Sequence, residues 1–248
     1  PDRVADFPLL ASSAAHLAGH RQAFSESFAA YRVRPNRAQA KWVLDHQFAR
    51  GINLFEFMFY PSSASAPDRH GFMAEDNFPA LAAYVRRASY LLAQGRPTVD
   101  VAVYYPTMSL WLGDDAADTA TWTLVRALAE RQIACDLLDD DTLATRLVLR
   151  DGALWNRSGQ GYRAVLVPGA SVISRGALSR LEAMVAHGGQ VVFAGPAPSL
   201  VVERSFREAR GPAEIGWALH APAGDLTSEV LATLPPEVHE KATAYTQG

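Results

Sequence analysis

The sequence of 248 residues predicts an α/β fold, in which short strands of parallel sheets alternate with helices. Near-continuous apolar runs over residues 52–60 and 162–169 are typical of strands that are covered on both faces. Stretches with apolar residues at helical spacing, as in residues 36–50 and 175–187, lie between such runs. Strand, helix and strand therefore follow one another along most of the chain.

The tripeptide Gly95-Arg96-Pro97 interrupts this pattern, and we interpret it as the boundary between two domains, residues 1–95 and 96–248. In the first domain, Gly19 is expected to end a short helix and Asn36 to cap a longer one. The expected elements are, in order, a helix over 12–19, a strand over 22–28, a helix over 36–50, a strand over 52–60 and a helix over 79–95.

The second domain restarts the alternation and predicts a doubly wound, flavodoxin-like parallel sheet. The dipeptide Asp151-Gly152 has the signature of a tight β-hairpin. From residue 200 onward the sequence predicts helices, for example over 201–210 and 226–234. The other expected elements are strands over 99–106, 133–138, 162–169 and 190–195 and helices over 118–131 and 175–187.

Composition and charge argue against several classes of function. Lysine and arginine (23) do not outnumber aspartate and glutamate (26), so a nucleic-acid-binding protein is not expected. The apolar run 52–60 is too short to span a bilayer, so no membrane segment is expected. The chain opens at Pro1 without a basic-then-apolar leader, and a signal peptide is therefore absent, already removed or outside this sequence. The single cysteine, Cys135, lies in an apolar run and predicts packing rather than catalysis.

Most motifs that could carry chemistry are incomplete. Residues 106–110 form neither a dinucleotide-binding nor a phosphate-binding glycine loop. Residues 168–171 lack a nucleophile elbow, so we expect no catalysis in the second domain. His16 and His20 are four residues apart, but Gly19 is expected to end the helix between them and no third ligand has suitable spacing. No metal site is therefore predicted.

Glu26 is the residue that most needs an explanation in the first domain. It lies between Phe24 and Phe28 in a run that reads as a strand, where an ionised carboxylate is costly unless it is paired or hydrogen-bonded. One interpretation is a catalytic carboxylate near the end of the strand. The other is a structural glutamate bonded to a neighbouring arginine or to backbone N–H groups.

Glu56 raises the same question, because it interrupts the apolar strand Leu54-Phe55-Glu56-Phe57-Met58. If the first domain is the end of a (β/α)₈ barrel, Glu26 and Glu56 lie on neighbouring strands near the catalytic face. Glycoside hydrolysis requires two such carboxylates. We then expect both to face one concavity, opened by the loop over residues 62–78. The structural alternative is an ion pair with an arginine from a further strand.

Three segments of the first domain resemble a known family of enzymes. They are Ala11-Ser12-Ser13-Ala14-Ala15-His16-Leu17-Ala18-Gly19, Ala23-Phe24-Ser25-Glu26-Ser27-Phe28 and Asp45-His46-Gln47-Phe48-Ala49-Arg50-Gly51-Ile52-Asn53. They are similar to the last strands of the barrel in large α-L-rhamnosidases of glycoside hydrolase family 106. Residues 90–95 and 99–106 resemble the passage into the flavodoxin-like (class I glutaminase-like) domain that follows such barrels, as it does in family 42 β-galactosidases.

The resemblance implies a fold, a reaction and a set of site residues. It implies the terminal portion of a TIM-type (β/α)₈ barrel with Glu26 and Glu56 as catalytic carboxylates. The substrate would be a carbohydrate with a terminal rhamnose, and hydrolysis is expected to invert configuration without an organic cofactor, with calcium as an optional ion. Candidate contacts to sugar hydroxyls are His16, Asn53, Tyr60 and His70.

Such enzymes are much longer than this chain, so the resemblance also implies that earlier strands of the barrel, and a catalytic acid on one of them, belong to the remainder of a parent enzyme. A homo-oligomer and a periplasmic or secreted location are compatible with it. Two alternatives stay open. One is another barrel glycosidase, such as a β-galactosidase, and the other is a non-catalytic α/β association module in which the two glutamates are structural.

Overall fold

The computed structural model describes residues 6–29, 31, 35–58, 71–73, 77–203, 205–208, 210–217, 219–221 and 234. The chain divides into two compact units. The first unit comprises Asp2–His16 and His20–Pro97, and the second comprises mainly Thr98–Gly248. Both units are built on parallel strands with intervening helices, which confirms the predicted α/β class.

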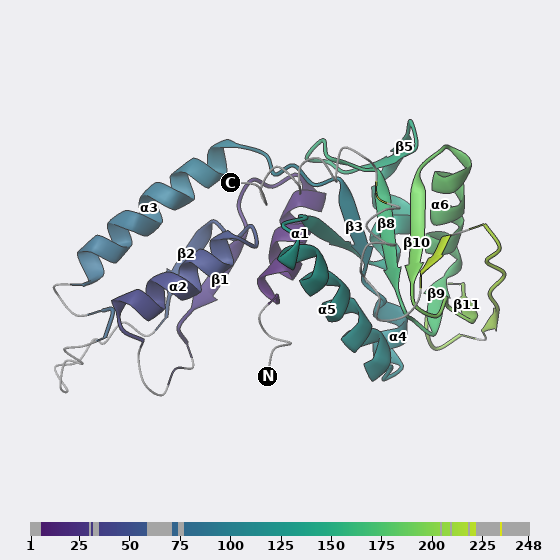
Figure 1. Ribbon diagram of the computed structural model, residues 1–248, viewed down its shortest axis with the longest axis horizontal. Helices are drawn as coiled ribbons and strands as arrows, with labels where there is room; N and C mark the ends of the chain where they lie inside the picture. The colour runs from purple at the N-terminus through teal and green to yellow at the C-terminus, as the bar shows by residue number, and fades with distance from the viewer. Residues whose placement is uncertain are drawn as a thin grey trace. The chain divides into compact units, whose positions relative to one another are not determined.

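In its described residues, the first unit has two short parallel strands and three helices (Figure 1). Strands β1 and β2 pair in register from Phe24 opposite Leu54 to Ser27 opposite Phe57. Parallel strands need a crossover connection, and α2 provides it here. The elements are α1 (Pro8–Ala18), β1 (Phe24–Ser27), α2 (Arg37–Phe48), β2 (Leu54–Phe57) and α3 (Phe78–Gln94).

Local sequence signals fix both ends of α2. The Asn36 side chain accepts a hydrogen bond from the Gln39 backbone, and the Gln39 side chain accepts one from the Asn36 backbone, which confirms the predicted N-cap as a capping box. After the helix, Gly51 has φ +85°, a conformation that favours glycine. A Cβ at this position would lie 2.8 Å from the Ser12 Cβ, so Gly51 also lets α1 approach closely.

One face of the two-stranded sheet packs against the helices. Phe55 contacts Phe48 of α2 with ring centroids 4.8 Å apart, and Phe57 contacts Phe78 of α3 at 6.1 Å. The same apolar cluster contains Leu44 and Leu81. Aromatic pairs of this kind add to the free energy gained by burial, so this face is the hydrophobic core of the unit.

A buried ion pair joins the segment before α1 to the segment after α2. Arg50 donates hydrogen bonds from Nε (2.8 Å) and Nη2 (2.6 Å) to Asp6 Oδ1. The Asp6 side chain is only 4% exposed, so its charge depends on this partner.

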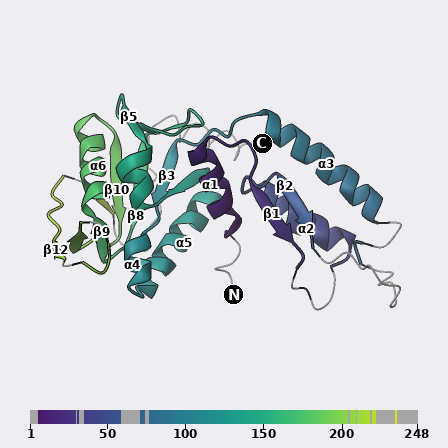
Figure 2. The ribbon, with the colours of Figure 1, turned by 180° about the vertical axis from the view of Figure 1, so that it is seen from behind.

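The second unit contains a five-stranded parallel sheet in the order β4-β3-β8-β10-β13. Helices α5 and α6 lie on opposite faces of this sheet (Figures 1 and 2). The strands are β3 (Val101–Tyr104), β4 (Cys135–Leu138), β8 (Ala164–Pro168), β10 (Gln190–Ala194) and β13 (Leu219–Ala221). The helices are α4 (Thr107–Trp111), α5 (Asp115–Glu130), the π-helix η2 (Thr142–Arg146) and α6 (Arg175–Ala186).

Two small sheets flank the main one. The first is antiparallel, and it is formed by β5 (Val148–Arg150), β6 (Ala153–Trp155) and β7 (Gly161–Tyr162). Its turn has φ +51° at Asp151 and +71° at Gly152, so the predicted hairpin is confirmed. The second is formed by β9 (Val172–Ser174), β11 (Leu200–Val202) and β12 (Gly211–Pro212).

The prediction of helices from residue 200 onward is wrong for the described part of that region. Residues 200–202 form β11, which pairs in parallel with β9, and residues 219–221 form β13 at the edge of the main sheet. Val201 and Val202 are buried, and β-branched side chains favour such paired, covered strands over helices. The second predicted helix, over 226–234, lies outside the described residues apart from Leu234.

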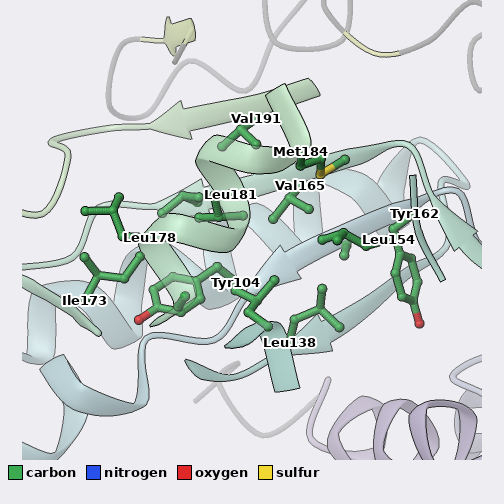
Figure 3. Close-up of a cluster of buried hydrophobic side chains, with 14 of the residues drawn as sticks. Tyr104, Leu138, Leu154, Tyr162, Val165, Ile173, Leu178, Leu181, Met184 and Val191 are labelled. Carbon is green, nitrogen blue, oxygen red and sulfur yellow. The ribbon is translucent and has the colours of Figure 1, made fainter. Parts of the chain in front are cut away.

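The core of the second unit lies between α6 and the strands (Figure 3). Leu181 and Met184 of α6 are fully buried with Val165 of β8. Cys135 is also buried, as predicted for a packing cysteine. These residues lie on the inward faces of their helix and strands, as the apolar periodicity of the sequence indicated.

Two tyrosines in this core are hydrogen-bonded to buried carboxylates. Tyr104 donates to Asp140 Oδ2 (2.9 Å), and Tyr162 donates to Asp136 Oδ2 (2.8 Å). Tyr162 Oη also accepts from Asn156 Nδ2 (2.7 Å). Burial, together with the neighbouring carboxylate, raises the pKa of both Tyr104 and Tyr162 above the usual value.

The buried ion pair gives a first prediction. Arg50→Ala should lower the free energy of unfolding of the first unit by about 3–5 kcal/mol, because it leaves the Asp6 charge buried without a partner. The additional change Asp6→Asn should recover part of this loss. Lys41→Ala, which breaks the exposed pair with Asp45, is the matched control and should cost less than about 1 kcal/mol. Hydrogen exchange of α2 amides in urea measures these differences, and equal losses in the two single variants would contradict the assignment.

The buried tyrosines give a second prediction. Their raised pKa favours the neutral phenol in the folded state, so the stability they contribute is complete below the unfolded tyrosine pKa of about 10 and is lost as pH rises above it. Each tyrosine should then cost up to about 1.4 kcal/mol per pH unit. Tyr162→Phe should make this alkaline loss shallower in urea unfolding, while lowering stability at neutral pH because Asp136 loses a donor. An unchanged slope would show that Tyr162 does not titrate in this way.

Candidate functional site

The pairing of β1 with β2 places Glu26 directly beside Glu56. Adjacent strands are about 4.8 Å apart, so the two carboxylates project side by side from one face of the sheet. Both residues are exposed. Like charges at neighbouring register positions destabilise a sheet, so this pair does not serve the stability of the fold.

These glutamates lie on the face that points away from the helices. Successive side chains alternate along a strand, and Ser27, Phe55 and Phe57 are on the side of α2 and α3. Glu56 is therefore not buried beneath the outer helices. Among the described residues, no ion pair to Glu26 or Glu56 is present, and the arginine partner of the structural alternative is not found there.

The prediction that the two carboxylates are costly charges in apolar surroundings is wrong for the described structure, in which both are exposed. Phe28, which follows β1 with φ +73°, lies among the helix-side aromatic residues instead of beside Glu26. Phe24, the other flanking residue, is itself 47% exposed.

An apolar pair lies on the same face as the acidic pair, nearer to the starts of the strands. Phe24 and Leu54 are opposite each other in the register, and they are 47% and 41% exposed. The face thus has an apolar layer toward the strand starts and an acidic layer toward the carboxyl ends. Exposed apolar side chains in register are typical of a sheet face that another part of a protein covers.

Asn53 and His16 do not join the two glutamates. Asn53 immediately precedes β2, and its side chain is committed to the start of β1: Oδ1 accepts from the Ala23 backbone (3.0 Å) and Nδ2 donates to the Arg21 carbonyl (2.8 Å). His16 lies near the end of α1, and its Cε1 would be 3.7 Å from a Cβ on Gly51. Both lie at the edge where the strands begin, so their placement favours a structural role. Tyr60 and His70 lie outside the described residues, as does most of the loop 62–78.

Comparison with known proteins identifies the family. The model of glycoside hydrolase family 106, described as alpha-L-rhamnosidase, matches residues 5–209. The chain belongs to this family. A relative from Formosa agariphila, named "Putative beta-glucuronidase", is 26% identical over 212 residues, which cover 79% of this chain and 17% of the relative.

Solved structures agree with this family assignment at the level of the fold. A rhamnosidase from Novosphingobium sp. PP1Y is 24% identical with a TM-score of 0.57, over 79% of this chain and 20% of that protein. An apo exo-carrageenase of family 42 from Bacteroides ovatus is 12% identical with a TM-score of 0.56, over 90% of this chain and 30% of that protein. The family 106 chain therefore spans about a fifth of the length of the relatives named first.

The hydrogen bond on the helix side of the acidic pair was not predicted from the sequence. Ser27 of β1 and Gln47 of α2 are both buried, and Gln47 Nε2 donates to Ser27 Oγ (3.1 Å). A small polar residue next to Glu26 in a strand was the signal that could have indicated this contact, because buried hydroxyls need a partner. The pair ties β1 to α2 beside the position of Glu26.

Two further properties of the family 106 chain concern ions and membranes. Among the described residues, no three histidine, cysteine, aspartate or glutamate side chains are grouped so that they could hold a metal ion. Within the same residues, none of the helices has the length and hydropathy needed to cross a bilayer.

The hydrogen bonds of Asn53 separate a structural role from contact with a sugar. Asn53→Ala should lower the free energy of unfolding by about 1–3 kcal/mol, because the buried Ala23 amide and the Arg21 carbonyl lose their partner. Asn53→Asp keeps an acceptor for Ala23 and should cost less. The KM of a complete enzyme for an aryl glycoside should not change. A higher KM with unchanged stability would restore Asn53 as a substrate contact.

Proposed function

We propose that this chain contributes the acidic pair Glu26 and Glu56 to the active site of an α-L-rhamnosidase, a glycoside hydrolase that removes terminal rhamnose from glycosides or polysaccharides. The observation that carries the proposal is the in-register placement of two exposed carboxylates on the open face of a parallel sheet. Membership of family 106 supplies the reaction class, and the rhamnosidase from Novosphingobium shares the fold.

In this proposal the first unit is the terminal portion of a TIM-type (β/α)₈ barrel. Its order of helix, strand, helix, strand and helix is that of two barrel repeats, and the exposed layer of Phe24 and Leu54 corresponds to a packed layer of the barrel interior. The remaining strands would come from the rest of a longer polypeptide, which is consistent with the greater length of the relatives.

The second unit is proposed to be flavodoxin-like. Numbered along the chain among themselves, the strands of its five-stranded sheet follow the order 2-1-3-4-5, which is the order of that fold. Helices cover both faces of the sheet (Figures 1 and 2). We propose that this unit supports the barrel and does not take part in the chemistry.

The two carboxyl groups can divide the reaction between them. One protonates the oxygen of the leaving group, and the other removes a proton from the water that attacks the anomeric carbon. Inverting enzymes separate these groups by about 6.5–9.5 Å and retaining enzymes by about 5–5.5 Å. Side chains on adjacent strands about 4.8 Å apart reach either separation, according to their rotamers. The resemblance to family 106 favours inversion.

The calcium that the resemblance allows is not assigned to this chain. Calcium takes 6–8 oxygen ligands in typical protein sites, and the described residues do not gather three carboxylates. Glu26 and Glu56 alone would be too few ligands, so no step of the proposed reaction uses the ion.

A second substrate class follows from the relative in Formosa agariphila. That protein is named as a β-glucuronidase, so a β-linked uronic acid is the alternative to rhamnose. The acidic pair fits either substrate, because it acts at the anomeric carbon, away from the carboxylate of a uronic acid. Membership of family 106 favours rhamnose.

Substitution of the two glutamates tests the proposal. In the complete enzyme, Glu26→Gln and Glu56→Gln should each lower the kcat for an aryl α-L-rhamnoside by roughly 10²–10⁴-fold, because an amide cannot transfer the proton. Glu203→Gln, which alters a carboxylate paired with Arg175 in the second unit, should leave kcat unchanged. NMR of the first-formed sugar anomer reports inversion or retention. If both glutamine variants keep full activity, a non-catalytic association module is the better interpretation of this chain.

A further inference from the structure

Phe28 has a backbone conformation that a bulky side chain rarely adopts. It follows the last residue of β1, two positions after Glu26, with φ +73°. Positive φ crowds the Cβ of an L-residue against its own backbone, so the position is strained unless the surroundings hold it. Only two other non-glycine residues in the described part of the chain, Gln132 and Asp151, share this property.

The positive φ decides on which side of the sheet the ring lies. In a continuing strand, residue 28 would share a face with Glu26, since side chains alternate with a period of two. Instead, Phe28 is buried, and its ring lies on the helix side, with its centroid 4.5 Å from that of Phe72 and 5.7 Å from that of Phe57. Phe28 thereby adds no aromatic side chain to the face of Glu26.

The strand stays paired up to this turn. The Met58 amide donates to the Ser27 carbonyl (3.0 Å), directly before Phe28. The Ser27 hydroxyl is held from behind by Gln47. Glu26 is therefore followed by one fixed residue and then by an abrupt change of direction, so the backbone that carries its carboxylate has little freedom at the end of β1.

We propose that Phe28 is a positioning residue for Glu26, and that its left-handed backbone keeps open the space beside Glu26 in which the sugar binds. This inference rests on the proposed function, because it assigns to Phe28 a part in the same site. The aromatic cluster with Phe57 and Phe72 holds the strained conformation. The backbone angle, rather than the ring itself, is the property that catalysis uses.

Two substitutions separate the backbone angle from the packing of the ring. Glycine adopts φ +73° without strain but removes the ring, whereas valine is apolar but, as a β-branched residue, disfavours positive φ. If Phe28 positions Glu26, Phe28→Gly should keep kcat within about threefold of the wild type, and Phe28→Val should lose about 10–100-fold in kcat. If Phe28 is only a packing residue, the order is reversed, because valine fills more of the cluster.

The measurement is kcat and KM of the complete enzyme on an aryl α-L-rhamnoside, with thermal unfolding of each variant. Phe28→Asn provides a second comparison if the valine variant does not fold, because asparagine tolerates positive φ and packs poorly. It should be less stable than the wild type and still active. Phe48→Leu trims the same apolar cluster away from β1, and it should lower stability without lowering kcat.

The outcomes distinguish this inference from the proposed function. Suppose that Glu26→Gln loses activity. If Phe28→Val is then as active as the wild type, or if Phe28→Gly is less active than Phe28→Val, the role of Phe28 is overturned and the proposed function stays in place. Activity that survives Glu26→Gln overturns the function, and the positioning role falls with it.

Discussion

The in-register parallel pairing of β1 with β2 is the constraint on which the first unit depends. Parallel strands cannot be joined by a tight turn, so the chain must leave β1, cross over as α2 and return to the same edge before β2. A slip of the register by one residue would turn Glu56 to the helix side and Phe55 or Phe57 to the open face. The burial of the two phenylalanines against α2 and α3 therefore also keeps Glu56 beside Glu26.

The residues that make the chain resemble its family are largely the ones that hold this arrangement. In the segment 45–53, Gln47 binds Ser27, Arg50 binds Asp6, and Asn53 joins the starts of both strands. Gly51 admits α1 at a distance that a side chain would block. These contacts explain why such a short motif is informative about the fold. They also single out Glu26 and Glu56, which have no structural task of this kind among the described residues.

The sequence allowed the order of elements to be predicted, because helices and strands of this chain follow their apolar periodicity and local caps. The Asn36 side chain caps the start of α2, and Asp151 and Gly152 adopt the positive φ angles of a tight hairpin turn. In both cases the local residues determine the backbone. The position of Phe28 on the helix side of the sheet, and not beside Glu26, could not be predicted. Nothing in the local sequence indicates a positive φ at a phenylalanine, since the conformation is held by Phe57 and Phe72 from other parts of the chain. Likewise β11 was missed because its pairing with β9 is a contact between distant segments.

The carboxyl edge of the second sheet shows why chemistry is expected in the first unit. In open parallel sheets, ligands bind where the strand order reverses, which is between β3 and β8 here. The segment after β3 turns into α4, and the fully buried hydroxyl of Ser109 accepts from the Val172 amide (3.0 Å) and donates to the Val172 carbonyl (3.0 Å). Asp114 accepts from the Ser171 amide and also caps α5. The hydroxyl of Ser109 and the carboxylate of Asp114 are thus bonded to the segment that precedes and begins β9. In the described part of the chain, by contrast, the carboxylates of Glu26 and Glu56 form no ion pair.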